Sequence, residues 1–422
     1  MNRLYRDTRN AGLLAGAYLW RRANRHTTFI AVTGSSGKTT SRNCLGAILS
    51  RVGPTFVTEG NKNASIGLSK NLLRVRPAHR YAVIEIGIDA PRQMRRRAGT
   101  VAPHMVVALG VADTHPRGLP TLDVVAREKA RALAALRPGG IAVLSGSDPR
   151  VRTMSAPQAS RTVFFGDCPD SVARASDVRA TLSEGLTFTL DTPRGRLPIQ
   201  IGLYGEHWVP GVLGAVAAAL ALDVPLDVIR AGLALVRPHM SRCEPVVLPN
   251  GAILIRDEHN GGVPSFLAAI GLIRSVQARQ RILILSNLHY LGDDPGARFQ
   301  WIAERIRTAV DRVIFVGPHA DIGARSARQA GMAESEVFGF NDLSEATEVL
   351  PRLTGDGDVI LLRGRRLDHL ERIVFAQFGR VSCWKALCDL RRACDTCEAL
   401  EARDRAGRPV ALPPLPFEPE LR

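Results

Sequence analysis

The chain has 422 residues, of which 45% are hydrophobic and 23% charged, and its formal net charge is +16. Single cores seldom exceed about 250–300 residues, so two or three domains are expected, and the composition excludes a disordered or fibrous protein. The positive charge is almost all arginine and is spread along the chain. It does not form the aromatic-interleaved patch that favours nucleic acid, so no nucleic-acid partner is expected.

Residues 1–28 contain one apolar run, AGLLAGAYLW (11–20), with arginines on both sides. The run is too short to span a bilayer and has no clear signal-peptide cleavage site. We expect an N-terminal helix that docks on the next domain. Peripheral contact with a membrane through this helix and a signal peptide are the alternatives.

Short apolar runs alternate with helical segments from residue 29, as in FIAVTG (29–34), YAVIEIG (81–87) and IAVLSG (141–146). This alternation indicates a parallel sheet covered on both faces, so a doubly wound α/β domain is expected over 29–238. Within it, the more polar residues near 165–200 predict small antiparallel strands, and 209–236 predict two helices.

The alternation returns after Arg242, with AILIRD (252–257), RILILSN (281–287) and DVILLRG (358–364) as strands. A second, Rossmann-like α/β domain is expected over 239–380. Residues 381–422 predict a cysteine-rich helix followed by a proline-rich, extended tail.

The segment AVTGSSGKTT (31–40) lies between a buried strand and a helix start. Glycines let the backbone approach a phosphate, helix N-terminal amides face the anion, a lysine reaches the outer phosphates, and a threonine hydroxyl can hold magnesium. The glycine spacing is shorter than in the usual P-loop, and a chance glycine turn is the alternative. We expect phosphate binding at Gly34, Ser35, Ser36, Gly37, Lys38, Thr39 and Thr40.

Two candidate metal ligands follow later strands. Glu85 interrupts an apolar strand, where a carboxylate needs a cation; magnesium or a nearby arginine would satisfy it. His115 lies just beyond the end of the strand MVVALGV (105–111), at the edge where open α/β sheets bind ligands. Its imidazole can complete a metal site, although an ordinary loop histidine is the alternative.

The segment TLDVVAREKARALAAL (121–136) has apolar residues at helical spacing, and Lys129 shares their face. No acid lies three or four residues away to pair with it, while Arg127, Glu128 and Arg131 are expected on other faces. A lysine turned inward either reaches back to the surface, is chemically modified, or binds a ligand.

The motifs GSSGKTT, TEGNKNASIG (58–67), VIEIG, His115 and AREK together resemble the central ATPase domain of the Mur ligases. IRDEHNGGVPS (255–265), LSNLHYLG (285–292) and VILLRGRRLDHLERIV (359–374) continue the resemblance into the second domain. It covers about residues 29–375. The resemblance implies an ATP-dependent, ADP-forming ligase that joins a carboxylate to an amine, such as an amino acid or peptide, through an acyl-phosphate, and that works in the cytoplasm.

The same resemblance implies roles for individual residues. Lys38 and its loop would bind ATP phosphates, Thr39 and Glu85 would hold a first magnesium, and His115 would serve a second one. Lys129 would be carbamylated and support that metal. Arg242 would approach the γ-phosphate, and Asp257 with the 258–261 loop, including Asn260, would contact the nucleotide.

The chain also departs from the family pattern. Trp208 and Gly211 stand where the family usually has asparagines that help hold the adenine, which favours the alternative of a non-catalytic nucleotide-binding subunit. Only 28 residues precede the first strand, where cell-wall Mur ligases carry a domain for a UDP-sugar substrate. We therefore expect that a UDP-muramoyl peptide is not the substrate.

Four of the seven cysteines lie within fifteen residues: Cys383, Cys388, Cys394 and Cys397. Their spacing could bind structural zinc or an iron–sulfur cluster. The alternative is that most of them are small core residues on one face of a helix.

Overall fold

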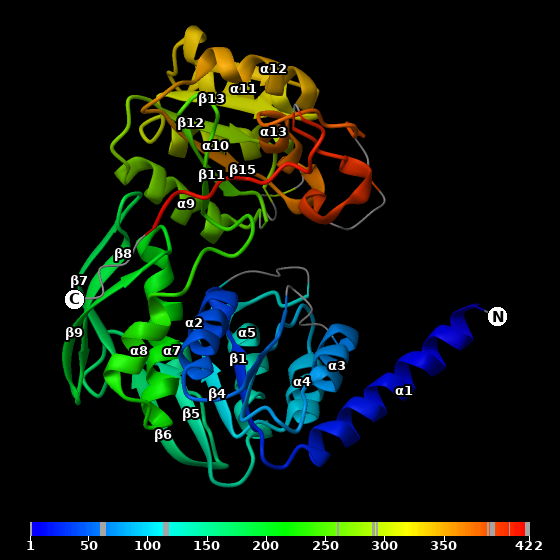
Figure 1. The fold of residues 1–422 in the computed structure, drawn as a ribbon, viewed down its shortest axis with the longest axis vertical. Coiled ribbons are helices and arrows are strands. Elements are labelled where there is room, and N and C mark those ends of the chain that lie inside the picture. The colour runs from blue at the N-terminus through cyan, green and yellow to red at the C-terminus, as the bar shows by residue number, and fades with distance from the viewer. Residues whose placement is uncertain are drawn as a thin grey trace.

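The computed structural model describes residues 2–59, 65–112, 118–259, 261–288, 292, 294–385, 388, 393–404 and 406–417, with side chains from residue 11 onward. Two α/β parts stand one above the other, and the chain passes once from the lower, N-terminal part to the upper one (Figure 1).

The lower part is built on one parallel sheet. Its six strands run in the order β2 (Thr55–Val57), β3 (Tyr81–Glu85), β1 (Thr28–Thr33), β4 (Met105–Ala108), β5 (Gly140–Ser145) and β6 (Ala159–Phe165). One apolar core lies under α2 (Lys38–Ser50), α7 (Val209–Ala221) and α8 (Leu226–Leu233), and a second under α3 (Ser65–Arg74), α4 (Gln93–Val101) and α5 (Leu122–Ala130). The short helix α6 (Pro149–Arg152) contacts α5 and β5. The doubly wound fold is confirmed.

A small antiparallel sheet follows, as the polar stretch predicts. It contains β7 (Arg174–Thr181), β8 (Gly185–Thr192) and β9 (Gly195–Ile201). Leu186, Phe188, Leu190 and Ile199 from these strands join the α2–α7–α8 core. The small sheet is therefore continuous with the lower part.

The upper part has a second six-stranded sheet. Its order is β10 (Glu244–Val247), β11 (Ile253–Asp257), β15 (Val359–Arg363), β12 (Arg281–Leu285), β13 (Arg312–Val316) and β14 (Val337–Phe340), parallel except for β10. Helices α9 (Val263–Ser275), α10 (Pro295–Ile306) and α11 (Ala320–Gln329) cover one face, and α12 (Leu343–Leu353) and α13 (Glu371–Ala376) the other. This is the expected second α/β domain.

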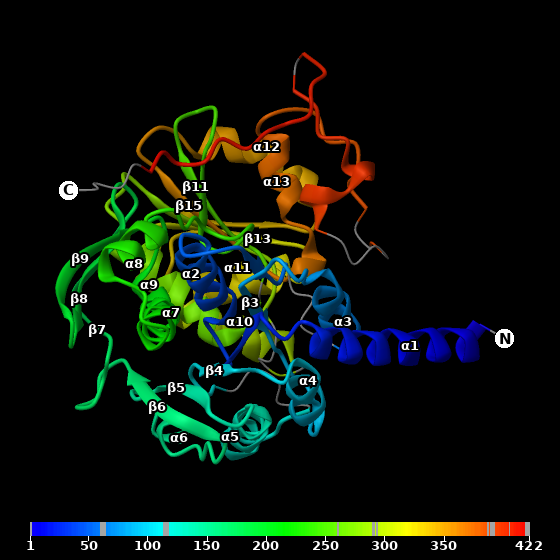
Figure 2. The same ribbon diagram turned by 60° about the horizontal axis from the view of Figure 1, so that its bottom comes forward.

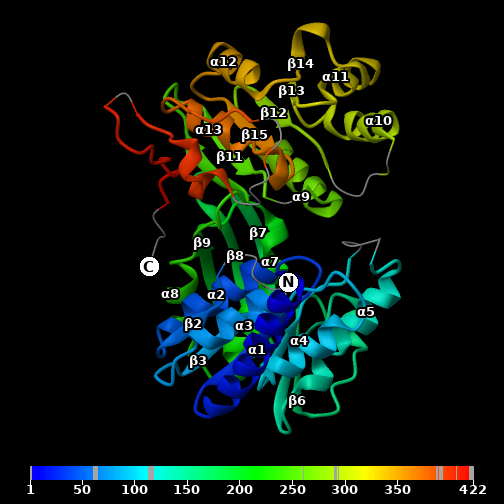
Figure 3. The ribbon, with the colours of Figure 1, turned by 90° about the vertical axis from the view of Figure 1, so that its right-hand side faces the viewer.

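The end of the chain corrects one expectation. Instead of a cysteine-rich α-helix, the described residues contain two short 3-10 helices, η5 (Cys394–Thr396) and η6 (Glu398–Leu400), beside α13 (Figure 3). Cys394 and Asp395 reach different buried partners, and such tertiary contacts override helix propensity. The tail then runs back along β10, where Val247 N donates to Pro413 O at 3.2 Å.

Helix α1 (Asn2–Ala23) docks on the lower part with its C-terminal half, while its N-terminal half projects outward (Figures 1 and 2). Trp20 Nε1 donates to Val75 O at 2.7 Å, and Ala17 is fully buried. Docking is what the sequence predicts for this helix. No described helix is both long and apolar enough to cross a membrane.

Arg21 holds α1 in place. Its side chain is 1% exposed, its Nε donates to Val101 O at 2.5 Å and its Nη2 to Ala102 O at 2.6 Å, and its guanidinium lies 3.7 Å from the centre of the Phe29 ring. It therefore caps the last carbonyls of α4 from a different helix.

We expect Arg21→Ala to lower the free energy of unfolding by about 2–3 kcal/mol, because it leaves two buried carbonyls without a charged donor. Chemical denaturation measures this. Arg22→Ala is the matched control, since Arg22 is exposed and stacks on Tyr18. Equal stability of the two variants would contradict the assigned role.

Candidate active site

The loop between β1 and α2 has the conformation of a phosphate cradle. Gly37 has φ of 74°, and α2 begins at Lys38, so the loop ends at a helix N-terminus. A Cβ on Gly34 would lie 2.7 Å from Leu109 Cβ, which only glycine avoids. Lys38 Nζ donates to the carbonyls of Gly34 at 2.7 Å and Ser35 at 3.1 Å. The amine therefore lies over the loop, where a phosphate would be bound.

Ser35 joins this loop to the end of β4. Its amide donates to Gly110 O at 2.8 Å, its hydroxyl donates to Ala112 O at 2.9 Å, and the amide of Ala112 donates to that hydroxyl at 2.8 Å. Ser35 thus fixes the loop that leads to His115 rather than presenting free donors to a phosphate. His115 itself lies outside the described residues.

Glu85 lies at the carboxyl end of β3, beside the loop, and is 2% exposed. Its Oε2 accepts from Thr39 Oγ1 at 3.1 Å and from Arg42 Nη1 at 3.0 Å. The sequence left two partners open for Glu85, a nearby arginine and magnesium. Arg42 pairs with the carboxylate, and Thr39, the expected second ligand of magnesium, also faces it.

A magnesium ion would fit the Thr39 and Glu85 oxygens. Adjacent ligands of octahedral magnesium at 2.0–2.1 Å lie about 2.9 Å apart, close to the observed 3.1 Å. Arg42 contacts the same carboxylate oxygen and would have to share it. The donor set, a hydroxyl and a carboxylate at a helix N-terminus, is the chemistry this ion prefers.

Lys129 on α5 is 5% exposed, and its neighbour on the buried face is Val125. Burial lowers the pKa of Lys129 well below 10.5, and the charge of Lys38 lowers it further. Glu128 is also buried, where Arg92 N donates to it at 2.8 Å and Arg131 pairs with it at 2.8 Å. Among the described residues no hydrogen bond to the Lys129 amine is found.

A pocket opens beside Thr39 and Thr40, between the start of α2 and the segment that leads to the upper domain. Burial lowers the pKa of Arg242, and the carboxylates of Glu85 and Asp257 act in the opposite direction. Arg242 is therefore close to one acid of the lower domain and one of the upper domain. The pocket is lined by Thr39, Thr40, Asn43, Leu203, Trp208, Val236, Arg237, His239 and Arg242.

The packing at position 211 leaves little room for the asparagine that the family usually has there. Helix α7 approaches the phosphate loop so closely that a Cβ on Gly211 would lie 3.1 Å from Gly37 O and 3.3 Å from Thr40 Cβ. Trp208 donates from Nε1 to Tyr204 O at 2.9 Å and contributes its ring to the pocket wall. An aromatic wall thus takes the place of amide groups.

Asp257 at the end of β11 is held inside its own domain. Its carboxylate pairs with Arg363 on the neighbouring strand and accepts from Cys243 N at 3.2 Å. Burial raises the pKa of Asp257 to about 6, against the effect of Arg363. A contact with nucleotide stays a prediction, and Asn260 lies outside the described residues.

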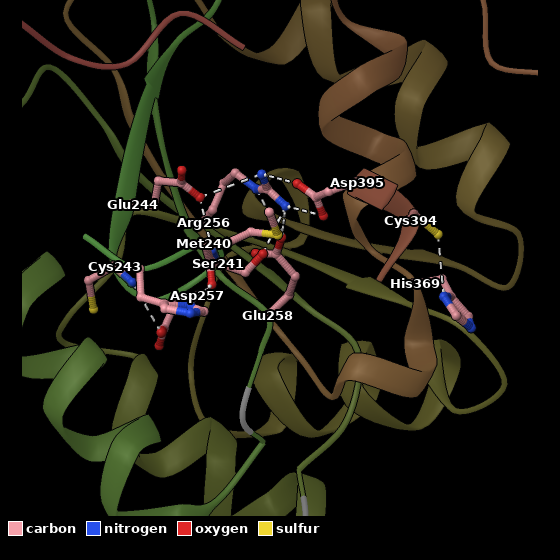
Figure 4. A network of polar contacts seen from close by, with 11 residues as sticks. Met240, Ser241, Cys243, Glu244, Arg256, Asp257, Glu258, His369, Cys394 and Asp395 are labelled. Carbon is pink, nitrogen blue, oxygen red and sulfur yellow. Dashed lines mark hydrogen bonds and ion pairs between the residues drawn. The ribbon is translucent and has the colours of Figure 1, made fainter. Parts of the chain in front are cut away.

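Among the described residues, the four C-terminal cysteines do not form one group of metal ligands. In the described part of the chain, the one group of three possible metal ligands is His369, Glu371 and Cys394. Cys383 and Cys397 are partly exposed and pack around Cys394 and Leu400. The candidate group is thus a mixed one rather than the expected four-cysteine set, and Figure 4 shows two of its members, His369 and Cys394.

Two family models match this chain. Residues 32–219 match the Mur ligase middle domain, and residues 241–366 match the Mur ligase glutamate ligase domain. Over 386 residues, 90% of this chain and 83% of the relative, the chain is 30% identical to the UDP-N-acetylmuramoyl-tripeptide–D-alanyl-D-alanine ligase of Escherichia coli. The chain belongs to the Mur ligase family. Like the other members, this Mur ligase is an ATP-dependent, ADP-forming ligase that joins an acid to an amino acid.

Other comparisons agree on the family and the fold. The Mur ligase of the same name from Haemophilus influenzae is 26% identical over 390 residues, 90% of this chain and 82% of its own. A crystal structure of MurF from Acinetobacter baumannii superposes with a TM-score of 0.80 at 26% identity, covering 87% of this chain and 80% of its own. The resemblance seen in the sequence motifs is thereby confirmed.

Sequence reasoning missed two residues of the candidate site. Arg42 lies three residues after Thr39 on α2, so both reach Glu85 from one helix face. That spacing was visible in the sequence as a charge on an otherwise buried helix. His239 lines the pocket and its pKa is lowered by burial, but it lies in a connecting segment that carries no periodic signal.

The lowered pKa of Lys129 predicts a pH-dependent stability difference. The unfolded chain binds a proton at Lys129 below pH 10.5, whereas the folded protein favours the neutral amine, so wild-type stability rises with pH towards 10.5. We expect the free energy of unfolding of Lys129→Met to exceed that of wild type at pH 7. The difference between the two free energies of unfolding should narrow by up to about 1.4 kcal/mol per pH unit as the pH rises.

Urea unfolding in carbon dioxide-free buffer measures this gap. Lys70→Met is the control for loss of a lysine charge as such, because Lys70 is exposed on α3. A gap that does not change between pH 7 and pH 10 would show that the Lys129 amine is not kept neutral by burial.

Proposed function

We propose that this Mur ligase phosphorylates a substrate carboxylate with ATP and couples the acyl phosphate to an amine, in the cytoplasm. The observation that carries this proposal is the grouping of Lys38, the Thr39–Glu85 pair and Arg242 around one helix N-terminus. Each supplies a positive or metal-binding contact to a transferring phosphoryl group.

In this proposal Lys38 leaves the loop carbonyls of Gly34 and Ser35 to bind the outer phosphates. Thr39 and Glu85 hold magnesium, which when bound would neutralise charge on the phosphoryl group. Arg242 reaches the same oxygens from the upper domain, so that the site is complete only when both domains face it. The aromatic wall at Trp208 receives the base of the nucleotide.

The role of Lys129 follows from its burial close to Lys38. Its neutral Nζ attacks the carbon of carbon dioxide, one C=O electron pair moves to oxygen, and a proton leaves to solvent. The resulting carbamate is an anion, so the burial of an ammonium beside Lys38 is avoided. This anion, with His115, would support a second magnesium.

The identity of the acid substrate is a more detailed question than the type of reaction. The relatives bear the name of UDP-N-acetylmuramoyl-tripeptide–D-alanyl-D-alanine ligases, so this pair is the first to test. The comparisons do not support our expectation that UDP-muramoyl peptides are not substrates, and it stays a prediction. The amine is expected to be an amino acid or a short peptide.

Turnover should release ADP and phosphate, and only when magnesium, an acid and an amine are all present. Coupled assays for ADP and for AMP, run on a panel of acids and amino acids, measure this. Glu85→Gln should lower kcat at least about tenfold, because it weakens the magnesium site. Release of AMP and pyrophosphate would refute the acyl-phosphate route, and ATP binding without turnover across the panel would favour a non-catalytic subunit.

UDP-muramoyl tripeptide with D-alanyl-D-alanine, the pair named for the relatives, is the first pair to run in the same assay. Calorimetry with the nucleotide-linked peptide alone provides an independent measurement. Saturable binding together with ADP release would overturn the expectation and assign the chain the activity named for its relatives.

Lys129→Ala should fold normally and lose most of its turnover, because it cannot form the carbamate. Acetate at high concentration should restore part of the rate by placing a carboxylate in the vacated space. Lys129→Arg tests the charge separately, since a guanidinium does not form this carbamate. Near-wild-type turnover of either variant would show that Lys129 is only a packed side chain.

A further inference from the structure

A group of possible metal ligands lies in the upper domain, formed by residues that the ligase reaction does not use. One donor atom from each of His369, Glu371 and Cys394 lies within 4.8 Å of the others, and the three residues are 3%, 2% and 5% exposed. His369 and Glu371 come from the turn after β15 and the start of α13, and Cys394 begins η5. The group therefore joins two segments that are distant in sequence.

The donor atoms are spaced as ligands of one ion. Cys394 Sγ lies 3.4 Å from His369 Nδ1 (Figure 4). Zinc bonds of about 2.3 Å to sulfur and 2.0–2.1 Å to nitrogen, at a tetrahedral angle, place these atoms about 3.6 Å apart. His369 also has φ of 53°, a backbone conformation uncommon for a residue with a side chain.

Two buried atoms of the group have no protein partner. His369 Nε2 and Glu371 Oε2 make no hydrogen bond to any of the described residues. A buried polar group without a partner is unfavourable, so Glu371 Oε2 calls for an ion or a water that satisfies it. His369 Nε2 lies on the other side of the ring from Nδ1, so an ion held by Nδ1 would satisfy Glu371 Oε2 and not Nε2.

The surrounding charges also call for a cation. Glu371 faces the carboxylates of Glu258 and Asp395, while Arg256 and Arg372 are the guanidinium groups nearby. Asp368 and Arg366 also act on His369, and Glu244 lies 3.5 Å from Arg256, so carboxylates outnumber guanidinium groups around the three residues. An excess of buried acids favours a cation.

The neighbouring contacts fix the position of η5. Arg256 donates from Nη1 to Asp395 Oδ1 at 2.6 Å, and the sulfur of Cys394 points to the other side, towards His369 (Figure 4). Two consecutive residues thus attach η5 to the upper domain in two directions. An ion at Cys394 would complete that attachment.

We propose that His369, Glu371 and Cys394 bind one Zn²⁺ ion that fastens η5 of the C-terminal segment to α13 and the turn before it. Nitrogen, oxygen and thiolate ligands together suit zinc, and one cysteine in the group does not suffice for an iron–sulfur cluster. Cys397, three residues after Cys394, is positioned in sequence to provide a fourth ligand.

The full-length protein, stripped with chelator and reloaded with ZnCl₂, should retain one zinc per chain by elemental analysis. Cys394→Ser and His369→Gln should each weaken zinc binding at least tenfold in a competition titration with a chromophoric chelator. Cys383→Ser is the matched control, because Cys383 lies in the same segment but outside the group, and it should bind zinc as wild type does.

Wild-type protein loaded with Co²⁺ provides a readout that does not depend on the variants folding. It should show a thiolate-to-cobalt charge-transfer band in the near ultraviolet, and zinc should raise its melting temperature. Failure of the reloaded wild-type protein to retain zinc, or loss of zinc in Cys383→Ser but not in His369→Gln, would overturn the proposal.

Discussion

A carboxylate buried at the end of a β-strand organises the lower half of this molecule. Glu85 is almost completely buried, so its charge must be met by partners inside the protein, and Thr39 and Arg42 meet it from one face of α2. Because α2 begins at the phosphate loop, the same contact fixes the direction of the loop amides. The geometry for binding phosphate is thus a consequence of neutralising one acid.

The upper domain follows a similar principle around a cation. Arg256 lies within a buried strand and is 1% exposed, and its guanidinium contacts Glu258, Asp395 and Ser241. These partners come from the strand end, the linker between domains and the C-terminal segment. A buried guanidinium with several acceptors therefore acts as a common attachment point, and loss of a single acceptor would leave a charge uncompensated.

Much of the fold could be predicted from the sequence, because apolar runs of strand length alternate with helical periodicity. The phosphate loop, Glu85 and the inward-facing Lys129 could also be predicted, since each departs from its local pattern. The pairing of Asp257 with Arg363 could not, because the two residues lie on neighbouring strands more than one hundred residues apart. The cysteine spacing was misleading for a related reason: the ligands nearest Cys394 are a histidine and a glutamate that follow a distant strand.

The tail of the chain ties the two domains together a second time. The first tie is the covalent segment between α8 and β10; the second is the described end of the chain, where Leu415 N bonds to Pro245 O and Arg237 lies 4.7 Å from the centre of the Phe417 ring. Arg237 is also part of the pocket wall. The segment between α8 and β10 and the C-terminal tail thus connect the two domains at two places. Rotation of one domain against the other is therefore restricted to motions that stretch or release the tail. A fusion or deletion at the C-terminus would therefore alter both domain movement and the Arg237 wall of the pocket.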